Sequence, residues 1–272
     1  MAKNSFKDST PENHSKQPAV SSKKSSWKSF FSFNNDQSLK GIIFSKLKKY
    51  TLYFFLITIA WATVLKYLPI WFTPTMISRK IDAISDGKPS KLYKDWEPME
   101  NISPEVSLAV MASEDQLFPE HKGYDFGAMS VAFKNNLKGK KIKGASTISQ
   151  QVAKNVFLWQ GRSYVRKVLE VYFTFLIEII WGKERILEVY LNVAEMGELT
   201  FGVEAASLRY YGHSAQNMSR AEAARIAAVL PSPLRFSIKN PSNYIIRRTN
   251  AISKQMRRLG GQKFVKKITS DK

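Results

Sequence analysis

The sequence predicts a mainly α-helical fold, and helix start signals at two places support this prediction. At Ser103, Pro104 and Glu105 a capping serine precedes a proline suited to the first turn and an acid. Ser219 and Glu222 have the spacing of a capping box ahead of an alanine-rich segment. We find no sustained alternation of apolar and polar residues, the pattern that half-buried strands show.

The chain has 272 residues, 44% of them apolar, which is enough for one or two domains with a substantial core. It contains no cysteine, which excludes disulfides, thiolate nucleophiles and cysteine-ligated metal sites. The 42 Lys and Arg residues against 22 Asp and Glu residues give a formal net charge of +20. This excess calls for a polyanionic neighbour: nucleic acid, an anionic membrane or a phosphate-bearing substrate.

The first element along the chain is a long apolar segment that follows a basic tail. Residues 1–49 hold ten Lys and three acids, are rich in Ser and Asn, and are expected to be disordered. Residues 50–72 match the thickness of a bilayer core and carry Lys66 as their single charge. A buried helix of a soluble protein rarely runs this long without polar residues, so we expect a single transmembrane helix here.

The basic tail also predicts an orientation in the cytoplasmic membrane. Because Lys and Arg beside a span stay inside, we expect residues 1–49 in the cytoplasm and the domain at residues 73–272 on the extracytoplasmic, periplasmic side. That domain carries thirty-one Lys and Arg against nineteen acids. A domain outside the cytoplasm meets no nucleic acid, so this charge is expected to face lipid headgroups or a phosphorylated lipid.

A buried helix in the outer domain is expected to end at two carboxylates. The run from Val106 to Ala112 is apolar nearly all round, so its helix should be buried. Glu114 and Asp115 follow directly, which puts a carboxylate at the edge of the core, where burial raises its pKa and suits it to proton transfer. A solvated acidic pair is the alternative. In the loop that follows, His121 is expected to be a structural hydrogen-bond partner.

A basic, glycine-broken loop leads into a polar helix. The loop at residues 138–143 suits contact with anionic headgroups, or it is simply solvated. Ser146 is placed to cap the helix. The residues that share one face of this helix are Thr147, Gln150, Gln151 and Lys154. A hydroxyl, two amides and a cation can bind a sugar or a phosphate, and a solvated face is the alternative.

Arg162, Arg166 and Glu170 recur at i+4 spacing, leading into a long apolar helix expected at residues 166–181. Charged side chains in so apolar a helix are costly unless they are paired. They can form a structural ion pair between Arg166 and Glu170, or they can bind a phosphate while the carboxylate orients the cations. The residues themselves leave both interpretations open.

These residues lie in motifs that resemble those of the monofunctional biosynthetic peptidoglycan glycosyltransferases, glycosyltransferase family 51. The matching segments are residues 114–125 (E-D-x-x-F-x-x-H-x-G-x-D), 144–155 (G-A-S-T-I-x-Q-Q-x-x-K-N), 166–170 with 186–192 (R-K-x-x-E and I-L-E-x-Y-L-N), 202–212 and 222–233. Five motifs in order over about 120 residues do not arise by chance. The wider similarity covers residues 90–258.

The resemblance implies a lysozyme-like glycosyltransferase domain that polymerises lipid II, a disaccharide carried on a lipid diphosphate. The 4-hydroxyl of one lipid II attacks the anomeric carbon of the growing strand, forms a β-1,4 link with inversion and releases undecaprenyl diphosphate. Glu114 matches the family's catalytic Glu, the general base, and Glu170 matches its second Glu. The expected partners are therefore lipid II, the lipid-linked glycan, the membrane and other proteins of cell-wall synthesis.

The remaining site residues are implied to bind substrate. The cations that would stabilise the departing diphosphate are Lys154, Arg162 and Arg166. The residues that would hold sugar hydroxyls or the loop around the base are Asp115, Gln150 and Gln151. No cofactor is required by the sequence, although a Mg or Mn ion could bridge the diphosphate to Glu170.

Two positions depart from the family pattern. The family often carries Gly-x-Gly where this chain has Gly197-Glu198-Leu199, and Phe where it has Tyr211. These departures concern the conformation of one loop and leave the catalytic groups in place.

Two other functions stay open. A lysozyme-like hydrolase or lytic transglycosylase also places a Glu at the end of a buried helix, but it needs no cations for a diphosphate. A non-enzymatic, membrane-anchored scaffold could recruit wall-building proteins through its basic outer domain. For the glycosyltransferase, an apolar patch at Trp71, Phe72 and Met76 is expected to dip into the bilayer, so that lipid substrates need not leave it.

Overall fold

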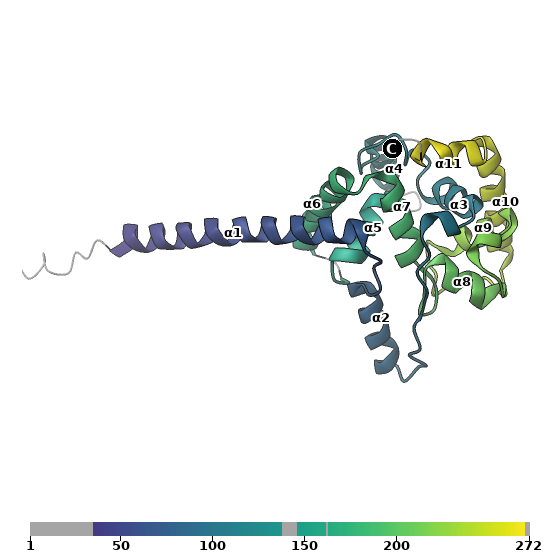
Figure 1. Cartoon of the computed structure of the whole chain (residues 1–272), viewed down its shortest axis with the longest axis horizontal. Helices are drawn as coiled ribbons and strands as arrows, with labels where there is room; N and C mark the ends of the chain where they lie inside the picture. The colour runs from purple at the N-terminus through teal and green to yellow at the C-terminus, as the bar shows by residue number, and fades with distance from the viewer. Residues whose placement is uncertain (1–34, 138–145, 162, 270–272) are drawn as a thin grey trace, which may run out of the picture. The chain divides into compact units, whose positions relative to one another are not determined.

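The computed structural model describes residues 35–137, 146–161 and 163–269, and Figure 1 shows the path of the chain. In these ranges the protein is mainly α-helical, as the sequence predicts. The helices are α1 (Asn35–Tyr67), α2 (Pro74–Ser85), α3 (Pro104–Glu114), α4 (Phe126–Leu137), α5 (Ile148–Phe157), α6 (Tyr164–Ile180), α7 (Gly182–Val193), α8 (Val203–Tyr210), α9 (Arg220–Val229), α10 (Asn243–Arg258) and α11 (Gln262–Thr269). Short 3-10 helices lie at Met99–Asn101 and Ala215–Asn217. The basic loop at residues 138–143 and Arg162 lie outside the described residues.

α1 contains a stretch, Leu39–Tyr67, that is long and apolar enough to cross a membrane. Its bounds differ from the sequence prediction at both ends. Residues 35–49, expected to be disordered, are helical, because a helix that is already nucleated extends at little further cost. The helix ends at Tyr67 rather than at residue 72, since Pro69 disfavours a helical conformation in the residue before it.

The chain divides into two compact units after Tyr53, inside α1. In the second unit, side chains from the start of α7 and the residue before it hold the last turns of α1. The Trp181 indole N–H donates to the Ala62 carbonyl at 2.7 Å, and the Arg185 guanidinium donates to the Leu65 carbonyl at 2.8 Å. The Arg185 bond satisfies one of the carbonyls that a helix end leaves without an intrahelical partner.

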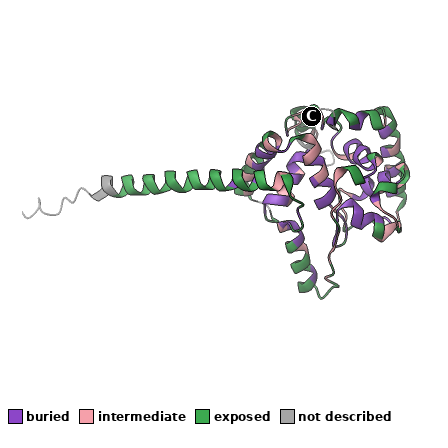
Figure 2. Ribbon diagram, viewed as in Figure 1, coloured by how far each residue is buried: buried purple, intermediate pink, exposed green. Residues whose placement is uncertain are grey.

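α3 lies at the centre of the second unit, and its residues from Val106 to Ala112 are all buried, as the sequence predicts. Ser103 caps it by accepting a hydrogen bond from the Glu105 N–H. α9 packs its small buried alanines against α3, and α10 and α11 also contact it. A second group of helices, α5, α6 and α7, pack against one another. Figure 2 shows the buried residues of both groups in purple.

Three short strands form a sheet that the sequence prediction missed. β1 (Tyr93–Lys94) pairs in parallel with β3 (Thr200–Phe201), which pairs antiparallel with β2 (Glu195–Gly197). Strands of two or three residues are too short to show alternation. In the turn between β2 and β3, Leu199 has a φ of 49°, in the left-handed region that glycine adopts most easily. This conformation gives a physical reason for the glycine that glycosyltransferase family 51, which the sequence resembles, often carries at the position of Leu199.

The apolar patch expected after the span is only partly exposed. Trp71 and Phe72 are exposed, but Met76 is fully buried. Met76 lies in α2, which packs against α5 and also buries Thr75 and Ala83. The prediction that Met76 contacts the bilayer is therefore wrong, because this side chain belongs to the protein core.

We expect Leu108→Ala to lower the free energy of unfolding by about 2–5 kcal/mol, because Leu108 is fully buried in α3 and its truncation leaves a cavity. Denaturant unfolding of the detergent-solubilised protein measures the loss. Leu208→Ala is the matched control, since Leu208 on α8 is 47% exposed and its truncation should cost only about 0.5 kcal/mol. Equal losses in the two variants would contradict the central position of α3.

Candidate active site

Glu114, the last residue of α3, lines a pocket of about 470 Å³. The other lining residues are Ser113, Asp115, Gln116, Leu117, Asp125, Ala128, Ser146 and Thr147. The Glu114 side chain is 14% exposed, so it is largely buried and still reaches the pocket. This position confirms the prediction of a carboxylate at the edge of the apolar core.

Three groups from different parts of the chain contact the Glu114 carboxylate. Gln151 Nε2 donates to Oε2 at 3.3 Å, and Ser113 Oγ donates to Oε1 at 3.2 Å. A guanidinium nitrogen of Arg248 lies 3.6 Å from Oε1. Burial raises the pKa of Glu114 above its usual range, while Gln151 and Arg248 oppose that rise. A carboxylate with a raised pKa at a pocket is suited to accept a proton.

Arg248 is a site residue that the sequence analysis missed. Its Nε donates to the Ala228 carbonyl at 3.2 Å, and its Nη2 donates to Ser113 Oγ at 2.9 Å. α10 carries several basic residues, so nothing in its sequence distinguishes this one. The packing of α10 against α3 and α9 brings Arg248 to Glu114.

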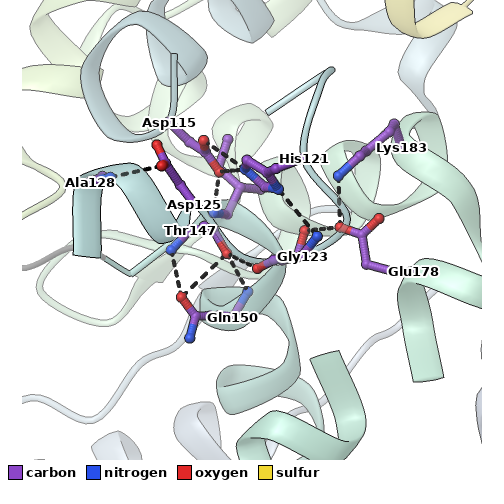
Figure 3. Close-up of polar contacts among 11 residues, drawn as sticks. Asp115, His121, Gly123, Asp125, Ala128, Thr147, Gln150, Glu178 and Lys183 are labelled. Atoms are coloured by element: carbon purple, nitrogen blue, oxygen red, sulfur yellow. Dashed lines mark hydrogen bonds and ion pairs between the residues drawn. The ribbon is translucent and has the colours of Figure 1, made fainter. Parts of the chain in front are cut away.

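Asp115 fastens the loop after α3 to the start of α5, as Figure 3 shows. Its Oδ2 accepts from the N–H of Ile148 at 2.9 Å, and His121 Nε2 lies 2.9 Å from Oδ1. Because His121 Nδ1 accepts from the Gly123 N–H at 3.1 Å, the neutral ring carries its proton on Nε2 and donates it to Asp115. Asp115 is 6% exposed, which favours its expected role in the loop over sugar binding. His121 has the structural role that the sequence predicts.

Thr147, and not Ser146 as expected, caps α5. Thr147 Oγ1 accepts from the Gln150 N–H at 3.2 Å, and Gln150 Oε1 accepts from the Thr147 N–H at 3.0 Å (Figure 3). Thr147 Oγ1 also donates to the Gly123 carbonyl at 2.7 Å. Gln150 is 3% exposed, and its side-chain oxygen is occupied by the cap. These contacts favour the structural one of the two roles expected for Gln150, because the cap that it completes is tied through Thr147 to the loop at Gly123.

A second cluster lies around Glu170, which is buried on α6. Lys167 Nζ donates to Oε1 at 2.6 Å, and Arg166 Nη1 donates to Oε2 at 3.4 Å. Lys154 on α5 is half-buried nearby; burial lowers the pKa of Lys154, and the charge of Glu170 opposes this. The Arg166–Glu170 ion pair forms, and Lys167 joins it. Among the described residues, three cations thus surround one carboxylate and leave an excess of positive charge.

α5 connects the two groups of side chains. Gln151 and Lys154 lie three residues apart on one helix face, with Gln151 at Glu114 and Lys154 near Glu170. The described lining of the pocket at Glu114 does not include Lys154, Arg166 or Glu170. α5 therefore contacts both Glu114 and the cluster at Glu170, while the described lining of the pocket includes Glu114 and none of the three cations.

The side chains around Glu170 do not make a resident metal site. No group of three or more His, Asp or Glu residues in the described ranges is placed to hold an ion. Both oxygens of Glu170, the carboxylate expected to bridge Mg or Mn, are bonded to Lys167 and Arg166. A divalent ion at Glu170 would have to displace these cations, so the donor set does not fit one.

Known proteins are similar in sequence to most of this chain. The family model described as transglycosylase matches residues 80–257. A biosynthetic peptidoglycan transglycosylase of Pseudomonas putida is 46% identical over 227 residues, which cover 84% of this chain and 96% of the relative. The protein of the same name from Yersinia pestis is 51% identical over 210 residues, which cover 76% and 87%. The matched range contains both the Glu114 pocket and the Glu170 cluster, and this chain belongs to the transglycosylase family.

Proposed function

We propose that this chain polymerises lipid II into β-1,4-linked glycan strands, with Glu114 as the general base. The relatives in Pseudomonas putida and Yersinia pestis, named biosynthetic peptidoglycan transglycosylases, support the reaction. The observation that carries the proposal is the Glu114 carboxylate, which lines a pocket, is largely buried and has a raised pKa. A base of this kind is what a sugar hydroxyl requires before it can attack.

The reaction needs a base on one side and positive charge on the other. The 4-hydroxyl of the acceptor sugar forms a bond to the anomeric carbon of the donor, and Glu114 takes the proton that the hydroxyl loses. The bond from that carbon to the diphosphate breaks, and its electron pair leaves with undecaprenyl diphosphate. Attack on the face opposite the leaving group inverts the α-diphosphate into a β-link.

The Glu170 cluster is suited to receive the departing diphosphate. The Arg166 guanidinium can bind a phosphate through two hydrogen bonds, and Lys154 adds a compact positive charge. Burial has stripped Lys154 of part of its hydration, so an anion brought beside it is strongly stabilised. Arg162, which the family resemblance implies as a further cation, lies outside the described residues and is proposed to add to this positive charge. Glu170 acts as a positioning residue, because its own oxygens hold Arg166 and Lys167.

The two alternative functions are less well supported. A hydrolase protonates a glycosidic oxygen and has no use for the positive charge of Lys154, Arg166 and Lys167. A scaffold has no need of a buried carboxylate with a raised pKa at a pocket. Synthesis from a diphosphate donor uses both features.

The apolar helix α1 suggests a single membrane anchor. We place its basic N-terminal side in the cytoplasm and residues 73–272 outside, because the Lys-rich tail favours the inside. The exposed apolar residues that follow one another along α6 are Tyr164, Val168, Val171, Phe175 and Ile179. α6 also touches the anchor, since the hydroxyls of Tyr172 and Thr58 share a hydrogen bond of 2.7 Å. A lipid substrate could therefore reach the site while its tail stays in the bilayer.

Glu114→Gln should lower the rate of lipid II polymerisation by about 100- to 10,000-fold, because it removes the proton acceptor and keeps the size of the side chain. Labelled lipid II and full-length protein in detergent, followed by gel separation of the glycan, give the rate. Glu120→Gln, exposed in the same loop, is the matched control and should keep wild-type activity. Polymerisation by Glu114→Gln at the wild-type rate would exclude Glu114 as the base.

Lys154→Ala should lower kcat on the order of 100-fold, because a fixed charge that stabilises the leaving diphosphate is lost. Lys254→Ala on α10, where the side chain is exposed, serves as the control for a general loss of positive charge. The same gel assay compares the two variants at saturating lipid II. If both lost activity equally, the effect would be one of net charge and not of a site at α5.

Single cysteines should report the orientation, since the chain has none of its own. In spheroplasts, a membrane-impermeant thiol reagent should label Lys254→Cys and leave Ser21→Cys unlabelled until the membrane is permeabilised. Labelling of Ser21→Cys alone in intact spheroplasts would reverse the proposed topology.

A further inference from the structure

Tyr190 on α7 lies behind the proposed base, in the protein core. Its side chain is 1% exposed, and the neighbouring Leu187 and Leu191 are fully buried. The Tyr190 hydroxyl donates to Gln151 Oε1 at 3.3 Å. No step of the proposed reaction uses this hydroxyl, and a phenylalanine would fill the same space in an apolar core.

Gln151 links this hydroxyl to Glu114. The two ends of its planar amide face opposite partners: Oε1 accepts from Tyr190, and Nε2 donates to Glu114 Oε2 at 3.3 Å. Among the described residues, the other contacts of the carboxylate, from Ser113 and Arg248, fall on Oε1. The amide of Gln151 is therefore the hydrogen-bond donor that Oε2 has within the described protein.

We propose that Tyr190 is a positioning residue that fixes the orientation of the Gln151 amide and thereby holds Glu114 in its ionised, proton-accepting form. This inference rests on the proposed function, in which Glu114 is the general base. Tyr190 itself touches no substrate in this scheme and acts through Gln151.

The direction of the amide matters because its two ends favour different forms of Glu114. The NH₂ end donates to a carboxylate, whereas a reversed amide would place its oxygen against the carboxylate and would suit the protonated acid instead. Tyr190 selects the first arrangement as long as it donates. Burial, together with the nearby charges of Glu114 and Asp115, raises the pKa of Tyr190 well above its usual value, so the hydroxyl keeps its proton.

The other charged groups around Glu114 do not replace this donor. Asp115 adjoins it and Asp125 lines the same pocket, and both are acids that disfavour a second negative charge. Arg248 from α10 favours the ionised form from the Oε1 side. Without the hydroxyl of Tyr190, the amide is free to turn and the balance shifts toward the protonated acid.

Tyr190→Phe should therefore shift the acid limb of the pH–rate profile upward by about 0.5–1 pH unit, the scale of one hydrogen bond between neutral groups, because the substitution removes the restraint on the Gln151 amide and not the amide itself. The sign follows from the base: activity requires ionised Glu114, and losing a donor to the carboxylate raises the pH at which it ionises. Below this acid limb kcat should fall about threefold to tenfold, because the rate there follows the ionised fraction of Glu114. At alkaline pH kcat should recover toward wild type, and the KM for lipid II should stay nearly unchanged.

Two further variants separate positioning from structural damage. Tyr211→Phe removes a half-buried hydroxyl that contacts the Glu222 carbonyl, so it should leave the profile unchanged. Gln151→Leu should reproduce the shift of Tyr190→Phe, and the double variant should show no additional shift, because both substitutions interrupt the same link. Thermal unfolding of each variant checks that it is folded.

An acid limb that stays in place in either Tyr190→Phe or Gln151→Leu overturns the inference, as do shifts that add up in the double variant. These outcomes differ from a failure of the proposed function. If wild-type protein did not polymerise lipid II, or if Glu114→Gln were fully active, the proposed function with Glu114 as the base would be wrong. If wild-type protein polymerises and Tyr190→Phe has an unshifted profile, only the role of Tyr190 is lost.

Discussion

The site depends on the way two adjacent carboxylates divide their contacts at the end of α3. A buried carboxylate is costly unless it is hydrogen-bonded, and a helix N-terminus offers unpaired N–H groups and the positive end of a dipole. Asp115 accepts a hydrogen bond from an N–H at the N-terminus of α5 and pairs with His121, each at 2.9 Å. Glu114 is left with longer contacts of 3.2–3.6 Å and access to a pocket. One carboxylate builds the loop, and its neighbour therefore remains able to exchange a proton.

Sequence patterns predicted those parts of the fold that local physics decides. The caps of α3 and α9, the burial of α3 and the position of Glu114 follow from residues within a few turns of one another. The short strands were not predicted, because two or three residues show no periodicity. The helical start of α1 at residues 35–49 was not predicted either. The conformation of Leu199 could not be predicted from its residue type either. The turn between two strands imposes a left-handed conformation that residues with a side chain disfavour.

Contacts in the candidate site could be predicted where both residues lie on one helix. Contacts between residues of different helices could not. Glu170 and Arg166 share a helix turn, so their pairing was one of the two interpretations that the sequence offered. The sequence left two roles open for Gln150, because a glutamine three residues after a threonine can complete a cap or belong to a polar face. Arg248 contacts Glu114 directly and Tyr190 contacts it through Gln151, both from helices far along the chain. Only tertiary packing brings these side chains to the site.

α7 is the element that connects the site to the apolar helix α1. Near its start, Arg185 donates to a carbonyl in the last turn of α1, and five residues later Tyr190 supports the amide that faces Glu114. Five residues of α-helix span roughly 8 Å, and most residues of α7 from Ile186 to Val193 are buried in the close-packed core. The proposed base is thus linked, through the amide of Gln151, to the same helix that holds the end of α1. A substrate whose sugar is joined to its lipid by a diphosphate, with the lipid in the bilayer, keeps its reacting carbon within the length of that diphosphate from the bilayer. A short rigid connection is therefore better suited to this substrate than a flexible linker, which would let the base move away from the membrane surface.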